Sequence, residues 1–78
     1  MKKIYINDKN RKILDNYQEI NYKPFLELED TADNINELLD VLDGAMLAYH
    51  DKDWEPLKEW LEIERVRDEI YYDYFERH

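Results

Sequence analysis

The sequence predicts an α+β fold in which a small antiparallel sheet of two or three strands precedes a two-helix hairpin. Over residues 2–29 apolar and polar residues alternate, and a period of two is typical of half-buried strands. After residue 30 the apolar residues recur every three or four positions, which is typical of a helix with one buried face. A chain of 78 residues buries only a thin core, so residues 1–78 are expected to form a single domain.

The strands are predicted from short runs in the first third of the chain. The isoleucines of residues 4–6 share one face of the first strand, and residues 8–11 are polar enough to form a turn. Residues 12–14 then resume a strand-like run. Between residues 20 and 28 the large apolar residues mostly occupy even positions, but Pro24 interrupts them. Because proline cannot donate a backbone hydrogen bond, this last strand is expected at an edge or with a bulge.

Two helices are predicted in the second half of the chain, over residues 31–50 and 54–76. Thr31 is a favourable N-cap for the first helix. Pro56 is acceptable in the first turn of the second helix, where its missing N–H removes no hydrogen bond. The apolar residues that fall on one face of the first helix are Ile35, Leu38, Leu39, Leu42, Met46 and Tyr49.

Charge is distributed unevenly along the chain. Twenty acidic residues oppose eleven basic ones, which gives a net charge of −9, and residues 25–51 contain no lysine or arginine. Asp33, Glu37 and Asp40 line up opposite Leu42, although like charges four residues apart destabilise a helix. The pattern indicates either a solvated face that favours solubility or a surface for a basic partner. In the second interpretation the partner-binding residues are Glu27, Glu29, Asp30, Asp33, Glu37, Asp40 and Asp43.

Catalysis and metal binding are not expected from the residue types present. The chain has no cysteine and no serine, and Thr31 is its only threonine, so the usual nucleophiles are lacking. His50 and His78 have no histidine partner at a metal-ligand spacing. A calcium-loop spacing begins at Asp51, but Pro56 stands where that loop requires glycine. The sequence therefore predicts a protein that is not an enzyme and holds no metal or other cofactor.

Aromatic and small residues indicate further contacts. Tyr71, Tyr72, Tyr74 and Phe75 fall within five residues and cannot all face one core, so the second helix is expected to pack on two partners. Small residues in the first helix allow another helix to approach closely, either within the chain or in a dimer. The residues that could contact a second copy or another protein are Gly44, Ala48, Tyr71, Tyr72, Tyr74 and Phe75. Packing within one chain is the alternative interpretation.

The N-terminal residues and the hydropathy of the chain predict a cytoplasmic protein without a membrane partner. The first apolar run stops after residue 6, unlike that of a signal peptide. No stretch approaches the roughly 18 apolar residues that a membrane helix needs. Nucleic acid is not expected as a direct partner, because its phosphates are repelled by the acidic surface.

The composition of the whole chain (small, acidic, rich in tyrosine and without cysteine) resembles that of bacteriophage-encoded inhibitors, including anti-CRISPR and DNA-mimic proteins. The resemblance rests on composition and on no motif. It implies an inhibitor in the host cytoplasm that blocks the basic surface of a host protein, such as a nucleic-acid-binding enzyme. An acidic antitoxin bound to a basic toxin is a variant of this hypothesis. The alternative is a structural or regulatory adaptor that forms a homodimer or larger homo-oligomer through its apolar and aromatic helix faces.

Overall fold

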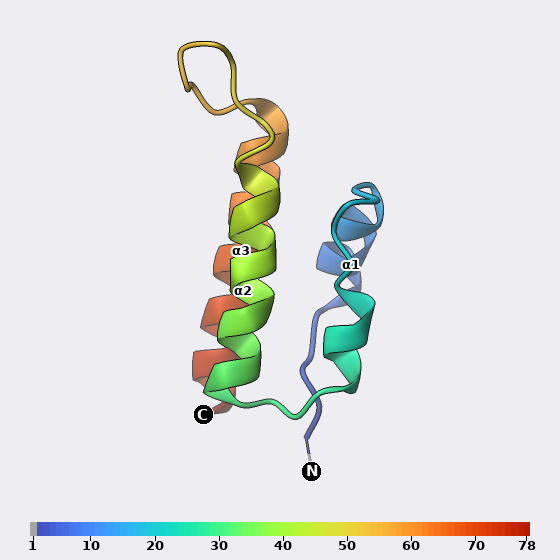
Figure 1. Cartoon of the computed structure of the whole chain (residues 1–78). Coiled ribbons are helices and arrows are strands. Elements are labelled where there is room, and N and C mark those ends of the chain that lie inside the picture. Colours follow the sequence, from blue (N-terminus) through green and yellow to red (C-terminus); the bar gives the residue numbers. More distant parts are fainter. Residues whose placement is uncertain (1) are drawn as a thin grey trace.

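The computed structural model describes residues 2–78 and is built of helices (Figure 1). In chain order these are helix α1 (Asp8–Asp15), the short 3₁₀ helix η1 (Lys23–Glu27), helix α2 (Ala32–Met46) and helix α3 (Lys58–Arg77). Helices α2 and α3 run antiparallel and form a hairpin, and the loop that joins them projects beyond the rest of the molecule. The molecule is therefore elongated, with dimensions of 44 × 21 × 20 Å.

The structure contradicts the predicted α+β fold, because no sheet is present within residues 2–78. The backbone there forms two isolated β-bridges, one between Lys3 and Glu29 and one between His50 and Pro56. The alternation at the N-terminus does mark an extended segment, but that segment lies between packed helices and pairs with another segment at a single bridge. A single bridge does not make a sheet, so the fold is all-helical.

Helix α1 replaces the turn and strand predicted over residues 8–14. Its first turn is stabilised by Asn7, whose side-chain oxygen accepts a hydrogen bond from the backbone N–H of Asn10 at 2.8 Å. Asp8 adds a negative charge at the positive end of the helix dipole. A helix of eight residues is marginal in isolation. Its stability therefore depends on burial of residues such as Leu14, which is fully enclosed in the core.

The alternating run at residues 20–28 does not form a strand either. Pro24 lies in the first turn of η1, where its missing N–H leaves no helical hydrogen bond unmade. Ile20 and Tyr22 are buried, as alternation predicts, but Leu28 is exposed. The period of two therefore ends where the 3₁₀ turn begins.

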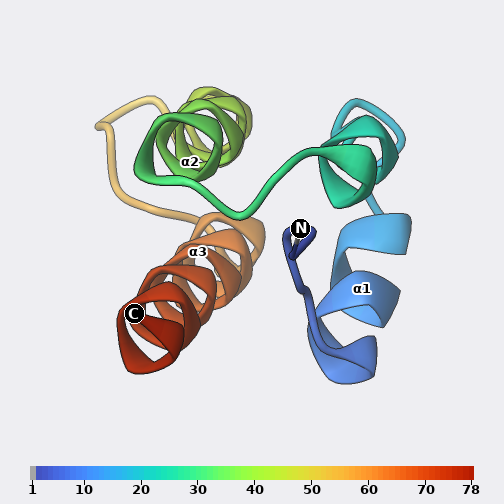
Figure 2. The same ribbon diagram turned by 90° about the horizontal axis from the view of Figure 1, so that it is seen from below.

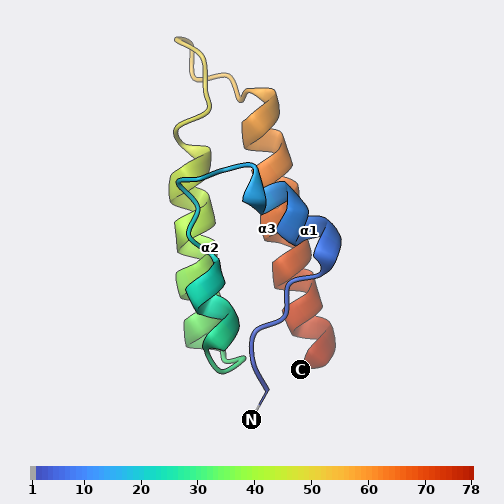
Figure 3. The same ribbon diagram turned by 90° about the vertical axis from the view of Figure 1, so that its right-hand side faces the viewer.

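The fold has two layers (Figures 2 and 3). One layer is the α2–α3 hairpin, and the other consists of residues 2–29, in which α1 lies over α3 and η1 lies over α2. The extended N-terminal segment runs between α1 and the hairpin. The buried core residues are Ile4, Ile6, Leu14, Tyr17, Ile20, Tyr22, Ile35, Leu38, Leu39, Leu42, Met46, Ile63, Val66 and Ile70.

Three tyrosine–carboxylate hydrogen bonds hold the segment between α1 and η1. The pairs are Tyr17 with Glu62 at 2.7 Å, Tyr22 with Asp15, and Tyr49 with Glu19. Burial and the hydrogen bond to Glu62 raise the pKa of the Tyr17 phenol, because only the neutral phenol can donate to a carboxylate. The bonds of Tyr17 and Tyr49 attach the segment to α3 and to the chain that follows α2, and the bond of Tyr22 ties it to the end of α1.

The loop between the hairpin helices is longer than the sequence predicts. Thr31 caps α2 with its side chain, but α3 begins at Lys58 rather than at Trp54. The reason is that Trp54 adopts a left-handed backbone conformation with φ of 63°, which a helix cannot accommodate. The carboxylate of Asp51 also accepts two backbone N–H groups of the loop. Residues 47–57 therefore form an ordered turn between the helices.

Candidate functional site

Asp30, one of the seven predicted partner-binding carboxylates, is buried, with only 1% of its side chain exposed. Its two oxygens accept hydrogen bonds from Arg77 at 2.9 and 3.0 Å, and the ring nitrogen of His78 lies 3.1 Å away. These hydrogen bonds from Arg77 hold the pKa of the Asp30 carboxyl below its usual value, against the opposing effect of burial. Asp30 joins the end of α3 to the start of α2, and it is not exposed to a partner.

Two further predicted carboxylates are paired with cations of the same chain. Asp43 accepts a hydrogen bond from the Arg67 Nε at 2.9 Å, which links α2 to α3. Glu27 is exposed and accepts a hydrogen bond from Lys3 at 2.7 Å. Both carboxylates are therefore largely neutralised, and they add less to the external field than the sequence suggests.

Asp33, Glu37 and Asp40 lie exposed on the outward side of α2, opposite its buried stripe. We call these three residues the acidic line. Within residues 2–78, no lysine or arginine nitrogen lies within 4.0 Å of their carboxylates. At a rise of about 1.5 Å per residue, three charges span about 10.5 Å of helix. Glu29 is also exposed and lies just before α2.

The residues predicted to contact a second copy or another protein do not share one surface. Gly44 and Ala48 are exposed near the end of α2, and a Cβ atom added at Gly44 would have no neighbour within 4 Å. The small residues are therefore not required for close helix packing within the chain. Tyr74 packs against the core, whereas Tyr72 remains 64% exposed. The other two aromatic residues, Tyr71 and Phe75, are also exposed, and their rings meet edge to face.

In addition to its buried stripe, α3 has an exposed apolar surface that extends along its outward side to the hairpin loop. It includes Leu61, which is 57% exposed, together with Leu57 and the aromatic residues near the end of the helix. In the loop itself Trp54 is 68% exposed and stacks on the ring of His50 at 3.8 Å. The spacing of apolar residues in the sequence indicates this second stripe, but it does not indicate that Trp54 lies outside the helix.

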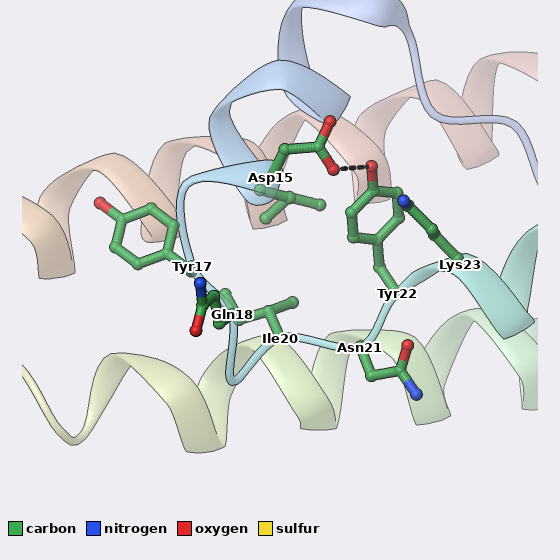
Figure 4. A pocket seen from close by; sticks show the side chains of 8 residues that line it. Asp15, Tyr17, Gln18, Ile20, Asn21, Tyr22 and Lys23 are labelled. Carbon is green, nitrogen blue, oxygen red and sulfur yellow. Dashed lines mark hydrogen bonds between the residues drawn. The ribbon is translucent and has the colours of Figure 1, made fainter.

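A hollow of about 240 Å³ lies between the end of α1 and η1 (Figure 4). Its one carboxylate, that of Asp15, already accepts a hydrogen bond from Tyr22. The hollow is smaller than the roughly 300–1,000 Å³ that is usual for small-molecule pockets. No ligand-binding or catalytic role is proposed for it.

Residues 2–78 contain neither a cluster of metal-ligating side chains nor a helix suited to a membrane. In that part of the chain no three histidine, aspartate or glutamate side chains are arranged so that they could hold a metal ion. None of the described helices is long and apolar enough to cross a membrane.

Comparison with protein-family models, with curated proteins and with solved structures gives no match. The function of this chain is therefore inferred from its own surfaces.

Proposed function

We propose that this chain is a small binding protein that inhibits a basic protein by covering its cationic surface with the acidic line of α2. The partner class favoured by the chemistry is a nucleic-acid-binding protein, whose groove is lined with lysine and arginine. The observation that supports the proposal best is the placement of the charges. Arg67, Arg77 and Lys3 pair with acidic residues elsewhere, whereas no lysine or arginine of residues 2–78 lies within 4.0 Å of the carboxylates of the acidic line.

The spacing of the acidic line suits a groove that binds phosphates. Its three carboxylates follow one another at about 4.5–6 Å along the helix axis. The phosphates of one DNA strand follow at about 3.4 Å along the duplex axis, so the charge density is of the same order. The carboxylates are carried on a helix whose other face is buried by Leu38 and Leu42, so the line is held in place before binding.

The net charge of the whole molecule supports the same partner class. A charge of −9 on a small protein attracts a cationic surface over several ångströms and speeds association. The same charge repels nucleic acid itself. Each exposed carboxylate contributes little alone, about 0.2–1 kcal/mol, so the line is expected to act as a group.

The test compares two triple variants that change the net charge equally. The first reverses the acidic line with Asp33→Lys, Glu37→Lys and Asp40→Lys. The control reverses three exposed acidic residues elsewhere, with Asp53→Lys, Glu55→Lys and Glu76→Lys. Both keep the apolar core, so thermal unfolding followed by circular dichroism should show a helical, cooperatively folded protein in each case.

The partner is first captured from a lysate of the source cells and purified, and a labelled DNA duplex is then bound to it. Unmodified protein and the control variant should displace the duplex, and the acidic-line variant should not. Displacement should weaken as salt rises from about 50 to about 300 mM, because screening shortens the reach of the charges. An acidic-line variant that displaces the duplex as well as unmodified protein does would contradict the proposal.

A homo-oligomeric adaptor is the alternative function. It depends on self-association, for which α3 carries a separate surface.

A further inference from the structure

Helix α3 has one side that no other part of residues 2–78 covers. Figure 2, which looks along the hairpin, shows α2 against one side of α3 and α1 against another, and the remaining side is open. Four large apolar residues lie along this open side, and each is between 40% and 64% exposed. We define the α3 outer face as Leu57, Leu61, Arg65, Asp68, Tyr72 and Phe75.

The α3 outer face has the spacing of a helix–helix seam. Its members follow one another at intervals of four, four, three, four and three residues, which keeps them on one side of a helix. Large apolar residues at such positions normally contact another helix. Here they extend over about 27 Å, which is long enough for a helix pair but gives an interface at the small end of stable ones.

The polarity of the residues along this face is symmetric about its centre, with two apolar residues at each end and two charged residues between them. Two leucines stand at one end and two aromatic residues at the other, and between them are one cation, Arg65, and one anion, Asp68. Arg65 is exposed, and within residues 2–78 no carboxylate lies within 4.0 Å of it. Asp68 is half-exposed, and its nearest cation is Arg67 at 3.5 Å.

We infer that the α3 outer face binds the same face of a second copy of this chain, antiparallel, about a two-fold axis between residues 66 and 67. In this register Arg65 lies opposite the second copy's Asp68, and Asp68 lies opposite its Arg65. Leu61 of one copy then lies opposite Tyr72 of the other. Leu57 lies one residue away from the position directly opposite Phe75 of the other copy. All six positions find complementary chemistry at once.

The charges at the centre favour a second copy over a basic foreign helix. A helix that carried only lysine and arginine at its centre would satisfy Asp68, but it would place like charges against Arg65. A second copy satisfies both, because a two-fold axis pairs each charge with its opposite. The acidic line lies on α2 and stays exposed in this arrangement, so the inference is independent of the proposed function.

The dimer and the proposed inhibition respond oppositely to salt. Two copies that each carry −9 repel one another at long range, and salt screens that repulsion. Self-association should therefore strengthen between about 20 and about 300 mM salt, whereas binding of a basic partner weakens. The salt dependence thus shows which of the two interactions is present.

The test uses charge reversal and sedimentation equilibrium. Unmodified protein should dimerise with a dissociation constant in the micromolar range. Arg65→Glu places a glutamate opposite Asp68 of the other copy at both symmetric positions, so two pairs of anions face each other. Asp68→Lys likewise places two pairs of cations opposite each other. Each single variant should bind itself at least about tenfold more weakly, although the first raises the net negative charge and the second lowers it. The double variant Arg65→Glu with Asp68→Lys should restore the dimer, since each pair is again of opposite charge.

A mixture of the two single variants gives a further check, because every facing pair is then complementary and a heterodimer should form. The register is tested by cysteine cross-linking, which the absence of native cysteine makes clean. Leu61→Cys mixed with Tyr72→Cys should form a disulfide between chains. Leu61→Cys alone should not, because its two copies lie about 16 Å apart along the helices.

Circular dichroism shows whether each variant keeps its helices, and all reversed positions are exposed, so folding should be unaffected. A monomer at several hundred micromolar protein in about 300 mM salt overturns the inference. So does a dimer that neither single reversal weakens, or one that the double reversal fails to restore.

Discussion

The two layers of this protein are held together by different forces. The α2–α3 hairpin packs through a continuous apolar stripe that includes Leu38, Leu42 and Ile63, all completely buried. The layer of residues 2–29 packs on the hairpin through buried residues such as Leu14, and hydrogen bonds from Tyr17 to Glu62 and from Tyr49 to Glu19 add long-range polar contacts. Apolar burial therefore leaves a periodic signal in a sequence, whereas long-range polar contacts leave none. This difference also predicts which substitutions each layer tolerates.

The largest effect is expected in the hairpin core. Leu38→Ala removes a completely buried side chain and leaves a cavity, so the free energy of unfolding should fall by about 2–5 kcal/mol. Urea unfolding followed by circular dichroism measures the change. Leu47→Ala is the control, since that leucine is 56% exposed and its loss should cost less than about 0.5 kcal/mol. Equal losses in the two variants would show that the hairpin is not held by this stripe.

The next largest effect concerns the Asp30–Arg77 ion pair, which joins the start of α2 to the end of α3. Asp30→Asn removes the charge opposite Arg77 and should lower the free energy of unfolding by about 2–3 kcal/mol. This is less than the about 3–5 kcal/mol for a fully buried pair, because Arg77 retains 23% side-chain exposure. Urea unfolding at neutral pH gives the value. The exposed Glu27→Gln variant loses a similar pair at the surface and should hardly differ from unmodified protein.

The same ion pair predicts an acid sensitivity. The pKa of Asp30 is lower in the folded protein than the ordinary value of 3.8, because Arg77 hydrogen-bonds its charged form. The contribution to stability is therefore present above about pH 4 and is lost as the pH falls through the folded value. Unmodified protein should lose more stability than Asp30→Asn between about pH 5 and pH 2. Parallel curves for the two proteins would assign the acid sensitivity to other carboxylates.

A substitution in α1 is expected to raise the free energy of unfolding instead of lowering it. Asn10 is completely buried, and neither polar atom of its side chain has a hydrogen-bond partner within residues 2–78. Asn10→Leu keeps the branched shape and removes two unsatisfied polar atoms, so the protein should become more stable by about 1 kcal/mol. Thermal unfolding measures the shift. A loss of stability instead would mean that the extra volume of leucine outweighs the removal of the polar atoms.

The smallest effect is expected at the hairpin loop. Trp54 holds a left-handed conformation that costs a non-glycine residue about 1–2 kcal/mol. Trp54→Gly relieves this strain, but it adds about 0.5–1 kcal/mol of backbone freedom to the unfolded chain and removes the stacking on His50, so a net change below about 0.5 kcal/mol is expected. Trp54→Ala keeps the strained Cβ and should be less stable than the glycine variant in the same urea titration. If alanine equals glycine, the loop is not strained at this position.

The helical hairpin and its acidic line could be derived from sequence, because both depend on residues a few positions apart. Thr31 is recognisable as a cap for the same reason. Helix α1 could not be derived from the sequence, because its eight residues include too few apolar positions to show a helical period. The isoleucines before it also alternate as they would in a strand. The burial of Asp30 could not be foreseen either. Its partner Arg77 is 47 residues away, and Asp30 looks in the sequence like any member of an acidic run.

The pairing of Asp30 with Arg77 also sets a gradient of flexibility along the hairpin. The backbone bonds from Asp30 to Lys2 and from Ile4 to Leu28 lie at the same end of the molecule as this ion pair. The opposite end consists of the projecting loop. Amide hydrogens that are bonded within the helix should therefore exchange with solvent faster in the last turn of α2 than in its second turn. The acidic line, from Asp33 to Asp40, lies within the first nine residues of α2 and so toward the end of the helix that these contacts hold.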